Sequence, residues 1–251
     1  MKSFTVALFL MLAVAVPSAS AGSRRFTYVY EVTTSPPGDV ESENWVTWKT
    51  RKPDDHSFDQ VEFRHELEFG ITEKFQLAVY FADWDYHRGI SAGESGFTLQ
   101  GSAIEMIYNL TNPVADPIGL AVYQEFNGGY RFFESESKLL AQKNLGKFVV
   151  AYNATLEAEW EGEGLEERTG EFQQSLGVSY EISPRLLVGA EFVHELEFPD
   201  WSGAEPGRFF AGPNISLRHR TWWVTLTALG QVTRAGSEPD LQVRTIFGFS
   251  F

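Results

Sequence analysis

Residues 148–161 read FVVAYNATLEAEWE, and the alternation in this stretch decides the fold class. Every second residue from Phe148 to Trp160 is apolar, while the residues between them turn polar at Asn153 and acidic near Glu161. A period of two predicts a β-strand whose two faces meet different surroundings. Strands of soluble sheets are usually about 5–6 residues long, whereas a tilted strand that crosses a bilayer needs about 9–11. The length of this stretch therefore favours a membrane barrel.

The same alternation recurs along most of the chain. It is clear in 171–182, 186–198 and 241–251, where one face is apolar and the other is polar or charged. Strands are predicted at 41–51, 58–70, 74–86, 97–110, 117–127, 131–143, 147–160, 170–182, 186–198, 208–219, 221–233 and 241–251. The sequence thus predicts an all-β fold, a transmembrane antiparallel up-and-down β-barrel of about twelve strands, with counts from about ten to fourteen left open.

Three stretches are irregular. Residues 131–143 alternate poorly, which keeps a barrel of fewer strands open, and residues 97–110 change phase near Ala103, which predicts a β-bulge. Residues 24–33 also read as extended, but the turn-forming Ser35-Pro36-Pro37-Gly38 follows them. We expect a periplasmic or lumenal lead-in there, with a thirteenth strand as the alternative.

Connections of two lengths alternate along the chain. Short turns are predicted at 71–74, 144–147, 182–185 and 218–221, and longer polar links at 51–57, 87–96, 161–170, 199–207 and 234–240. Outer-membrane barrels combine short periplasmic turns with longer external loops in the same way. We therefore expect both ends of the chain on the periplasmic side.

The composition excludes several classes of protein. The chain has 251 residues, with 20 Lys or Arg against 34 Asp or Glu and a formal charge of −14, which argues against nucleic acid as a partner. It has no cysteine, so disulfides, Cys-ligated zinc, iron–sulfur clusters and thiol catalysis are excluded. Gly-rich phosphate loops are also absent from the sequence, and we expect no cofactor.

The first 21 residues differ from the rest of the chain. Lys2 precedes an apolar run that ends at Val16, and Ala19-Ser20-Ala21 is a small-x-small cleavage site. The run is too short for a transmembrane helix, which needs about 20 residues. We expect cleavage before Gly22. A secreted chain could also fold as a soluble β-sandwich, which is the alternative to a membrane barrel. The expected domains are a signal peptide at 1–21, a lead-in at 22–40 and an outer-membrane barrel at 41–251.

The chain ends in VRTIFGFSF, residues 243–251. With the signal peptide and the repeated two-faced hairpins, this ending resembles those of Gram-negative outer-membrane β-barrels. The resemblance implies a place in the outer membrane, among its lipids, and a C-terminal signal that the barrel assembly machinery reads. The aromatic residues of that signal are Phe247, Phe249 and Phe251. Hairpins 69–77 and 180–188 are similar to those of uncharacterised putative transporter barrels of the phenol meta-pathway type, a likeness that carries no site residues over.

Glutamates gather on the face opposite the apolar residues of the predicted strands. Turning such a charge to lipid is costly, so we expect these side chains to face the lumen. The predicted lumen-lining residues are Glu62, Arg64, Glu66, Glu68, Glu157, Glu159, Glu161, Glu191, Glu195, Glu197 and Arg244. Such a lumen concentrates cations and repels anions. The sequence therefore predicts passive or facilitated passage of a small solute or ion. A closed, side-chain-filled barrel with a structural or surface-binding role stays open, with Arg64, Arg218 and Arg244 as counter-charges.

The histidines give no metal or catalytic motif. His65-Glu66-Leu67-Glu68 lacks the second histidine of a His-Glu-x-x-His site, so we expect no metal site and no catalytic residue. There is no Gly-x-Ser-x-Gly elbow. A Ser–His pair contributed by separate strands is invisible in a sequence, which leaves a lipid-modifying outer-membrane enzyme as a third candidate. We expect the tryptophans to lie mostly in interfacial girdles.

Overall fold

The computed structural model describes residues 23–89 and 95–251. All of the regular secondary structure in these ranges is β-strand. The predicted signal peptide, residues 1–21, lies outside them. The strands are β1 (Val40–Lys52), β2 (Asp55–Thr72), β3 (Phe75–Arg88), β4 (Gly96–Thr111), β5 (Gly119–Gly129), β6 (Phe132–Leu145), β7 (Phe148–Glu161), β8 (Glu167–Ser183), β9 (Leu186–Pro199), β10 (Arg208–Arg218), β11 (Trp222–Gln231) and β12 (Leu241–Ser250). The predicted antiparallel barrel of twelve strands is confirmed.

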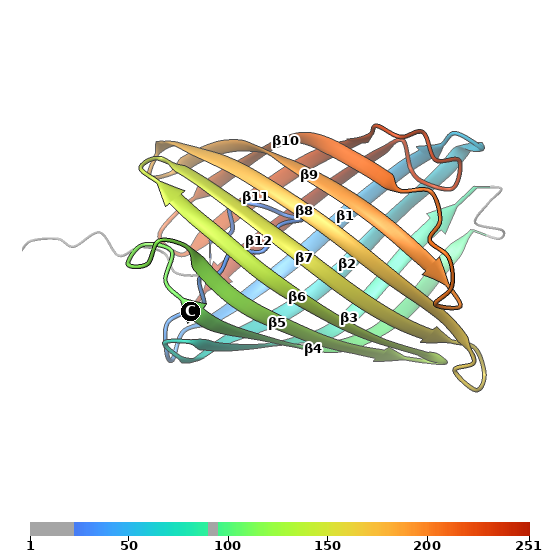
Figure 1. Ribbon diagram of the computed structural model, residues 1–251, viewed down its shortest axis with the longest axis horizontal. Helices are drawn as coiled ribbons and strands as arrows, with labels where there is room; N and C mark the ends of the chain where they lie inside the picture. Colours follow the sequence, from blue (N-terminus) through green and yellow to red (C-terminus); the bar gives the residue numbers. More distant parts are fainter. Residues whose placement is uncertain (1–22, 90–94) are drawn as a thin grey trace, which may run out of the picture.

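Strands β1 and β12 close the barrel (Figure 1). They pair antiparallel, from Glu41 opposite Ser250 to Thr50 opposite Leu241. Closure pairs every strand on both sides, which a lipid environment requires because no water is present there to satisfy open backbone groups. Because β1 begins where β12 ends, we call this end of the barrel the inner end and the opposite end the outer end.

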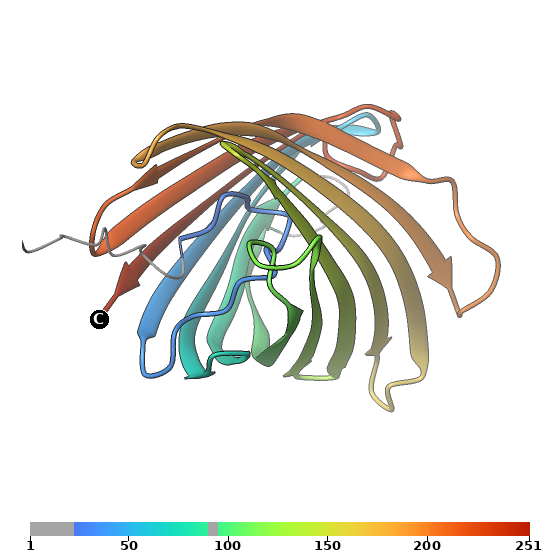
Figure 2. The same cartoon turned by 60° about the vertical axis from the view of Figure 1, so that its left-hand side comes forward.

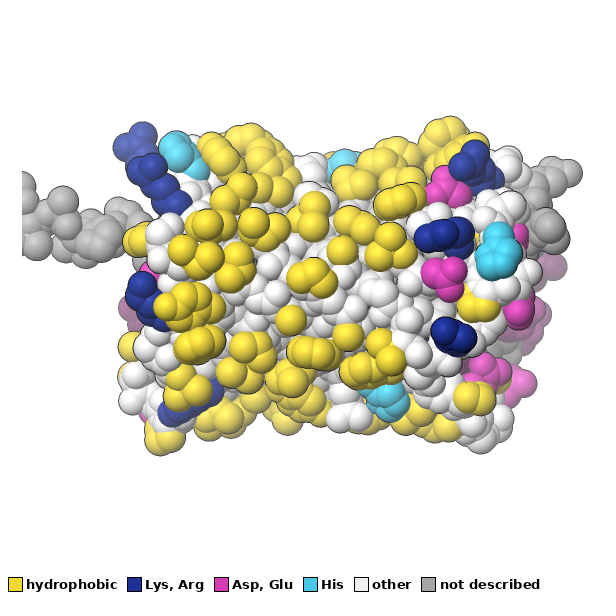
Figure 3. Space-filling view, turned by 90° about the horizontal axis from the view of Figure 1, so that it is seen from above, with side chains coloured by type: hydrophobic (Ala, Val, Ile, Leu, Met, Phe, Trp, Pro, Cys, Tyr) yellow, Lys and Arg dark blue, Asp and Glu magenta, His cyan; other side chains and the backbone are white. Residues whose placement is uncertain are grey.

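Alternate residues of each strand face the lumen and the surroundings. In β7, Asn153 is 1% exposed and Thr155 is 2% exposed, whereas Leu156 is 64% exposed. On the face seen in Figure 3, apolar side chains cover the barrel wall, and charged side chains gather toward its two ends. This distribution suits a wall that contacts lipid. In the part of the chain that the structure describes, no helix combines the length and the apolar character needed to span a bilayer.

One predicted link is wrong, and another is only partly described. The long link expected at 51–57 is a tight turn, because β1 runs to Lys52, β2 starts at Asp55, and these two residues pair. Arg51 has a φ of 51°, and the register shifts between Thr50 and Lys52. This irregularity reverses the chain within a few residues, so the polar residues belong to strand ends. Part of the predicted link 87–96 lies outside the described residues.

Both irregular windows form strands. The β3–β4 ladder shifts between Tyr80 and Trp84, opposite Gly101, which confirms the predicted bulge. In β6, Ser137 donates to the Gln124 side chain of β5 at 2.6 Å, and Gln124 donates to Ser135 at 3.1 Å. Polar residues are tolerated on an apolar face when they satisfy one another, and this pairing accounts for the weak alternation in β6.

Candidate functional site

Residues 23–35, which we call the N-terminal segment, lie inside the barrel (Figure 2). Phe26 and Val32 are 0% exposed, and Val29 is 2% exposed. The segment does not form a thirteenth strand. It lies across the lumen and is held by side chains of the wall.

The β9 residue Glu191 holds the middle of the N-terminal segment. Its carboxylate accepts the backbone N–H groups of Thr27, Tyr28 and Val29 at 2.9, 2.6 and 3.1 Å. The side-chain amide of Asn214 also donates to it, at 3.2 Å. Buried N–H groups need acceptors, and here one carboxylate serves three successive ones. An inward-facing Glu191 is predictable from the sequence, but its partner, a segment of the same chain, is not.

Side-chain amides of the wall bind the next part of the segment. Asn153 accepts the backbone N–H of Tyr30 at 2.7 Å and donates to the carbonyl of the same residue at 3.0 Å. Gln142 accepts the N–H of Val32 at 3.0 Å. These polar side chains take the place of the neighbouring strand that extended backbone otherwise needs.

An apolar contact anchors the first half of the segment. Phe26 packs in a cluster with Val29, Val149 and Ala151. A Cβ atom built on Gly177 of β8 lies only 2.7 Å from the Phe26 ring. The missing side chain at position 177 therefore makes room for this ring.

The N-terminal segment separates two cavities of the lumen. The outer cavity has a volume of about 560 Å³, and the inner cavity has a volume of about 420 Å³. Tyr30 lines both of them, whereas Tyr28 and Arg244 line the outer cavity and Arg24 lines the inner one. Burial raises the pKa of the Tyr28 phenol, and the Arg244 guanidinium, 4.0 Å from the centre of its ring, only partly opposes this. Among the described residues, Tyr30 is the one that borders both cavities.

Acidic side chains outnumber basic ones around the outer cavity. Among the described residues, twelve carboxylates and five Lys or Arg side chains line it. The carboxylates are Glu62, Asp83, Asp85, Glu125, Glu134, Glu136, Glu157, Glu159, Glu161, Glu171, Glu195 and Glu238, and the cations are Lys49, Arg64, Lys138, Arg208 and Arg244. The outer cavity therefore has a negative formal charge.

Six neighbouring strands, β4 to β9, each place a glutamate in one row across the barrel wall. We call this the glutamate row. Each member lies directly opposite the next in the strand register, in the order Glu105, Glu125, Glu136, Glu157, Glu171 and Glu197. Like charges placed opposite one another destabilise a sheet. Sheet packing alone therefore gives no reason for such a row.

Arginines compensate the two sides of the glutamate row. On one side, Arg64 donates to Glu125 at 2.7 Å. On the other side, Arg208 lies 3.0 Å from Glu171 and 2.6 Å from Glu197. These are charge-assisted contacts, which are the stronger class of hydrogen bond. They balance the ends of the row and leave its middle more negative.

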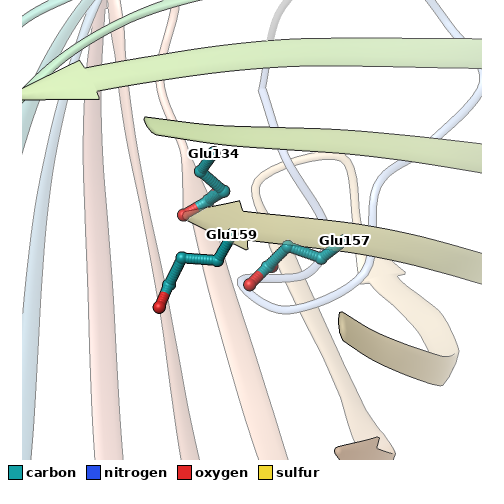
Figure 4. A group of neighbouring side chains, drawn as sticks. All are labelled: Glu134, Glu157 and Glu159. Atoms are coloured by element: carbon teal, nitrogen blue, oxygen red, sulfur yellow. The ribbon is translucent and has the colours of Figure 1, made fainter. Parts of the chain in front are cut away.

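Glu157, in the middle of the row, lies among carboxylates without a cation. Glu157 forms a trio with Glu134 and Glu159, whose carboxylate oxygens lie within 4.8 Å of one another (Figure 4). Within the described part of the chain, none of these three side chains makes a hydrogen bond or an ion pair; the nearby Lys138 binds Glu136 instead, at 2.7 Å. Oxygen clusters of this kind suit hard cations. The sequence predicts no metal site and does not indicate this grouping, because Glu134 lies in the weakly alternating β6.

The structure places the eleven predicted lumen residues in three groups. Seven line the outer cavity: Glu62, Arg64, Glu157, Glu159, Glu161, Glu195 and Arg244. Three contact the N-terminal segment: Glu66 through Arg24, Glu68 through Ser35, and Glu191 through the backbone. The last, Glu197, pairs with Arg208. That these residues line a path for a solute stays a prediction.

Sequence reasoning missed other inward carboxylates. They include Glu41, Glu43, Glu105, Glu125, Glu134 and Glu136. The alternation of polar and apolar residues in β1, β4, β5 and β6 was the sequence signal that could have found them. It was weakest where apolar residues such as Tyr123 and Leu140 also point inward and blur the distinction between faces.

Two tryptophans are exceptions to the expectation that most of them lie in interfacial girdles. Trp45 and Trp223 point into the lumen and are 4% and 0% exposed. Their indole N–H groups donate to Glu43 at 3.0 Å and to Glu41 at 2.8 Å. A buried indole needs such an acceptor, and the inward glutamates of β1 supply it.

Strand serines bind the N-terminal segment. The hydroxyl of Ser216 donates to the carbonyl of Arg24 at 3.0 Å, and that of Ser175 donates to the carbonyl of Tyr28 at 3.5 Å. His65 contacts the outward Asn44 at 2.9 Å. Among the hydrogen bonds of the described residues, none joins a serine hydroxyl to a histidine, so the described hydrogen bonds offer no support for a Ser–His catalytic pair.

The chain belongs to a family of unknown function, DUF6662, whose model matches residues 18–245. A comparison with curated protein sequences finds no match.

Solved structures with a similar fold are outer-membrane barrels. The COG4313 outer membrane channel from Pseudomonas putida F1 has a TM-score of 0.64 at 11% identity, and the match covers 88% of this chain and 98% of the channel. The NanC porin has a TM-score of 0.54 at 8% identity, over 84% of this chain and 98% of the porin. The β-domain of the Bordetella autotransporter BrkA has a TM-score of 0.56 at 11% identity, over 86% of this chain and 100% of that domain. This protein therefore has the fold of outer-membrane β-barrels.

Proposed function

We propose that this protein gives small cationic solutes a passage across the outer membrane. The passage runs through the outer cavity, past the N-terminal segment and into the inner cavity. The single observation that carries the proposal is the glutamate row, six carboxylates in direct register across β4 to β9.

The physical reason is the field inside a narrow lumen. Carboxylates on low-dielectric walls raise the local concentration of cations and repel anions. The outer cavity has more than twice as many carboxylates as cations among its described residues. The trio of Glu134, Glu157 and Glu159 leaves this charge uncompensated near the middle of the row. A cationic solute gains most from such surroundings.

The similar structures support passage in general. Two of them are named as a channel and a porin. Their low sequence identity gives no information on the solute, so the preference for cations rests on the charges of this chain.

Charge reversal inside the outer cavity tests the proposal. The double variant Glu157→Lys with Glu195→Lys should shift ion selectivity toward anions, measured as the reversal potential of a planar bilayer under a salt gradient. The control is Glu163→Lys with Glu205→Lys, which changes the charge by the same amount on exposed residues outside the outer cavity. A conducting double variant with the selectivity of the control would overturn the lumen assignment.

A closed barrel with a structural or surface-binding role is the second candidate. The observation in its favour is the N-terminal segment, which lies between the two cavities. The two candidates differ in a simple measurement. A closed barrel stays silent in a bilayer and gains conductance only when residues 23–35 are deleted, whereas the proposed passage conducts in the intact chain.

We also propose how the protein reaches the membrane. Residues 1–21 would be removed as a signal peptide, which the mass of the protein purified from outer membranes tests directly. The C-terminal aromatics would be read by the barrel assembly machinery. Phe251 is 83% exposed, and Phe249 stacks edge-on against Phe247 with ring centres 4.4 Å apart. Slower assembly after deletion of Phe251 is the expected result, and an unchanged rate would contradict this role.

A further inference from the structure

The side chain of Arg24 lies where the two cavities approach each other. Arg24 lines the inner cavity, Trp45 lines the outer one, and Tyr30 lines both. The guanidinium of Arg24 lies over the faces of the two aromatic rings, 4.5 Å from the centre of Tyr30 and 4.8 Å from that of Trp45. A solute that moves between the cavities meets this position.

Two buried carboxylates complete the surroundings of the guanidinium. Its Nε donates to Glu43 at 2.9 Å, and Nη2 lies 3.9 Å from Glu66. Both glutamate side chains are 0% exposed. We call the enclosure formed by Tyr30, Glu43, Trp45 and Glu66 the Arg24 pocket.

The Arg24 pocket is not fully satisfied by its occupant. Neither carboxylate oxygen of Glu66 has a hydrogen-bond partner, although the side chain is fully buried and faces the guanidinium. Among the described residues, the guanidinium of Arg24 makes a single hydrogen bond, the one to Glu43. A guanidinium offers five N–H donors. Arg208 shows the contrast, because it lies within 3.5 Å of four carboxylates.

Purely structural ion pairing does not account for this arrangement. Leaving a buried carboxylate unpaired is costly, and a counter-ion selected only for stability would bind Glu66 directly. The faces of Tyr30 and Trp45, whose ring centres lie 6.5 Å apart, border the cation on two adjacent sides. Such aromatic faces are instead the elements of a recognition site, since flat and weakly hydrated guanidinium groups stack on aromatic rings. The pocket therefore has the residues of a guanidinium-binding site, and the side chain of Arg24 satisfies their hydrogen-bonding groups only in part.

We propose that the Arg24 pocket is the binding site for the solute that this barrel passes, that the solute carries a guanidinium group, and that Arg24 occupies the site until such a solute displaces it. The inference rests on the proposed passage and names its substrate class. The backbone of Arg24 is bound separately, through its carbonyl, by Ser216 and Thr225 at 3.0 and 2.7 Å. The side chain can therefore leave the pocket while the N-terminal segment stays in place.

Replacing Arg24 with alanine tests the site without relying on conductance. The variant Arg24→Ala removes the internal occupant and keeps all four pocket residues. Ethylguanidinium, which has the head group of an arginine side chain, should bind the refolded variant and raise its midpoint of urea unfolding, because a ligand that binds only the folded state stabilises it. The intact chain should show a much smaller shift at the same concentration, since Arg24 competes.

Matched variants and probes make the test specific. Arg25→Ala removes the neighbouring arginine, which pairs with Glu31 outside the pocket, and should respond like the intact chain. The double variant Arg24→Ala with Glu43→Gln should lose the shift. Ethylammonium, which has the same charge without the planar group, should give a smaller shift for Arg24→Ala than ethylguanidinium does. Equal shifts for the two probes, or equal shifts for Arg24→Ala and Arg25→Ala, would overturn the inference.

Failure of this inference and failure of the proposed passage are distinguishable. Ethylguanidinium binding is measured in detergent and needs no current, whereas passage is measured as current and needs no guanidinium. A barrel that conducts cations while Arg24→Ala ignores ethylguanidinium retains the passage and refutes the site. A variant that binds ethylguanidinium in a barrel that never conducts retains the site and refutes the passage.

Discussion

At the scale of the residue, the lumen is shaped by a few positions where size and charge are matched to the N-terminal segment. Gly177 is the clearest, because any side chain there meets the ring of Phe26. The contact joins β8 to a segment about 150 residues earlier in the sequence, and no local sequence pattern predicts it. Glycine at this position therefore reports on tertiary packing, since its φ is not in the left-handed region.

Replacing Gly177 with alanine should loosen the N-terminal segment. The new Cβ atom would lie 2.7 Å from the Phe26 ring, so the ring must move within a packed cluster. Overpacking of this kind typically costs about 1–3 kcal/mol, and we expect a loss of that size in the free energy of urea unfolding. Gly128→Ala is the control, since a Cβ there meets nothing within 4 Å. Equal stability of the two variants would contradict the packing described for Phe26.

At the scale of the element, each strand has one face toward lipid and one toward the lumen. The free-energy cost of a charged residue on the lipid face depends on its depth in the membrane. Leu156 lies near the middle of β7 and is 64% exposed, whereas Val150 lies close to its inner end. Arginine on the lipid face costs about 2–4 kcal/mol at the bilayer midplane and about 0–1 near the interfaces. Leu156→Arg should therefore reduce the folded fraction in lipid vesicles more than Val150→Arg does. The reverse order would mean that the membrane lies elsewhere on β7.

The elements themselves were largely predictable from the sequence. Period-two alternation located most of the strands, because a wall between lipid and lumen imposes opposite chemistry on its two faces, and it was weak only at 97–110 and 131–143. The alternation pattern gave a wrong prediction at 51–57, where the structure has an irregularity at Arg51 and a tight turn in place of the expected long link. It also could not place residues 24–33, because their partners are single side chains such as Glu191 and Asn153 on distant strands. A segment bound by side chains leaves no periodic signal.

The candidate site was only partly predictable for a related reason. Strands such as β7 and β9 show their inward glutamates plainly, because the opposite face is apolar. The glutamate row depends on strand register across six strands, which is set by turns and bulges over the whole barrel. The Arg24 pocket depends further on where a non-strand segment lies. The register of the strands and the docking of the N-terminal segment are set in the closed barrel, and the sequence of a single strand does not show them.

At the scale of the whole molecule, the barrel combines a lipid-facing apolar belt with an interior rich in carboxylates. The excess of acidic residues, 34 against 20 basic ones, is partly concentrated around the outer cavity, where twelve of the carboxylates are found. The cations there are mostly engaged, as Arg64 and Arg208 show. The field in the lumen should consequently favour cations whatever path a solute takes past the N-terminal segment.

Whether the barrel passes cations is decided by the reversal potential of the refolded intact barrel in a planar bilayer under a salt gradient. We expect discrete conductance steps whose reversal potential lies toward the equilibrium potential of the cation, and larger steps of the same selectivity after deletion of residues 23–35. Anion selectivity, or silence from the folded intact barrel, would contradict the proposed passage.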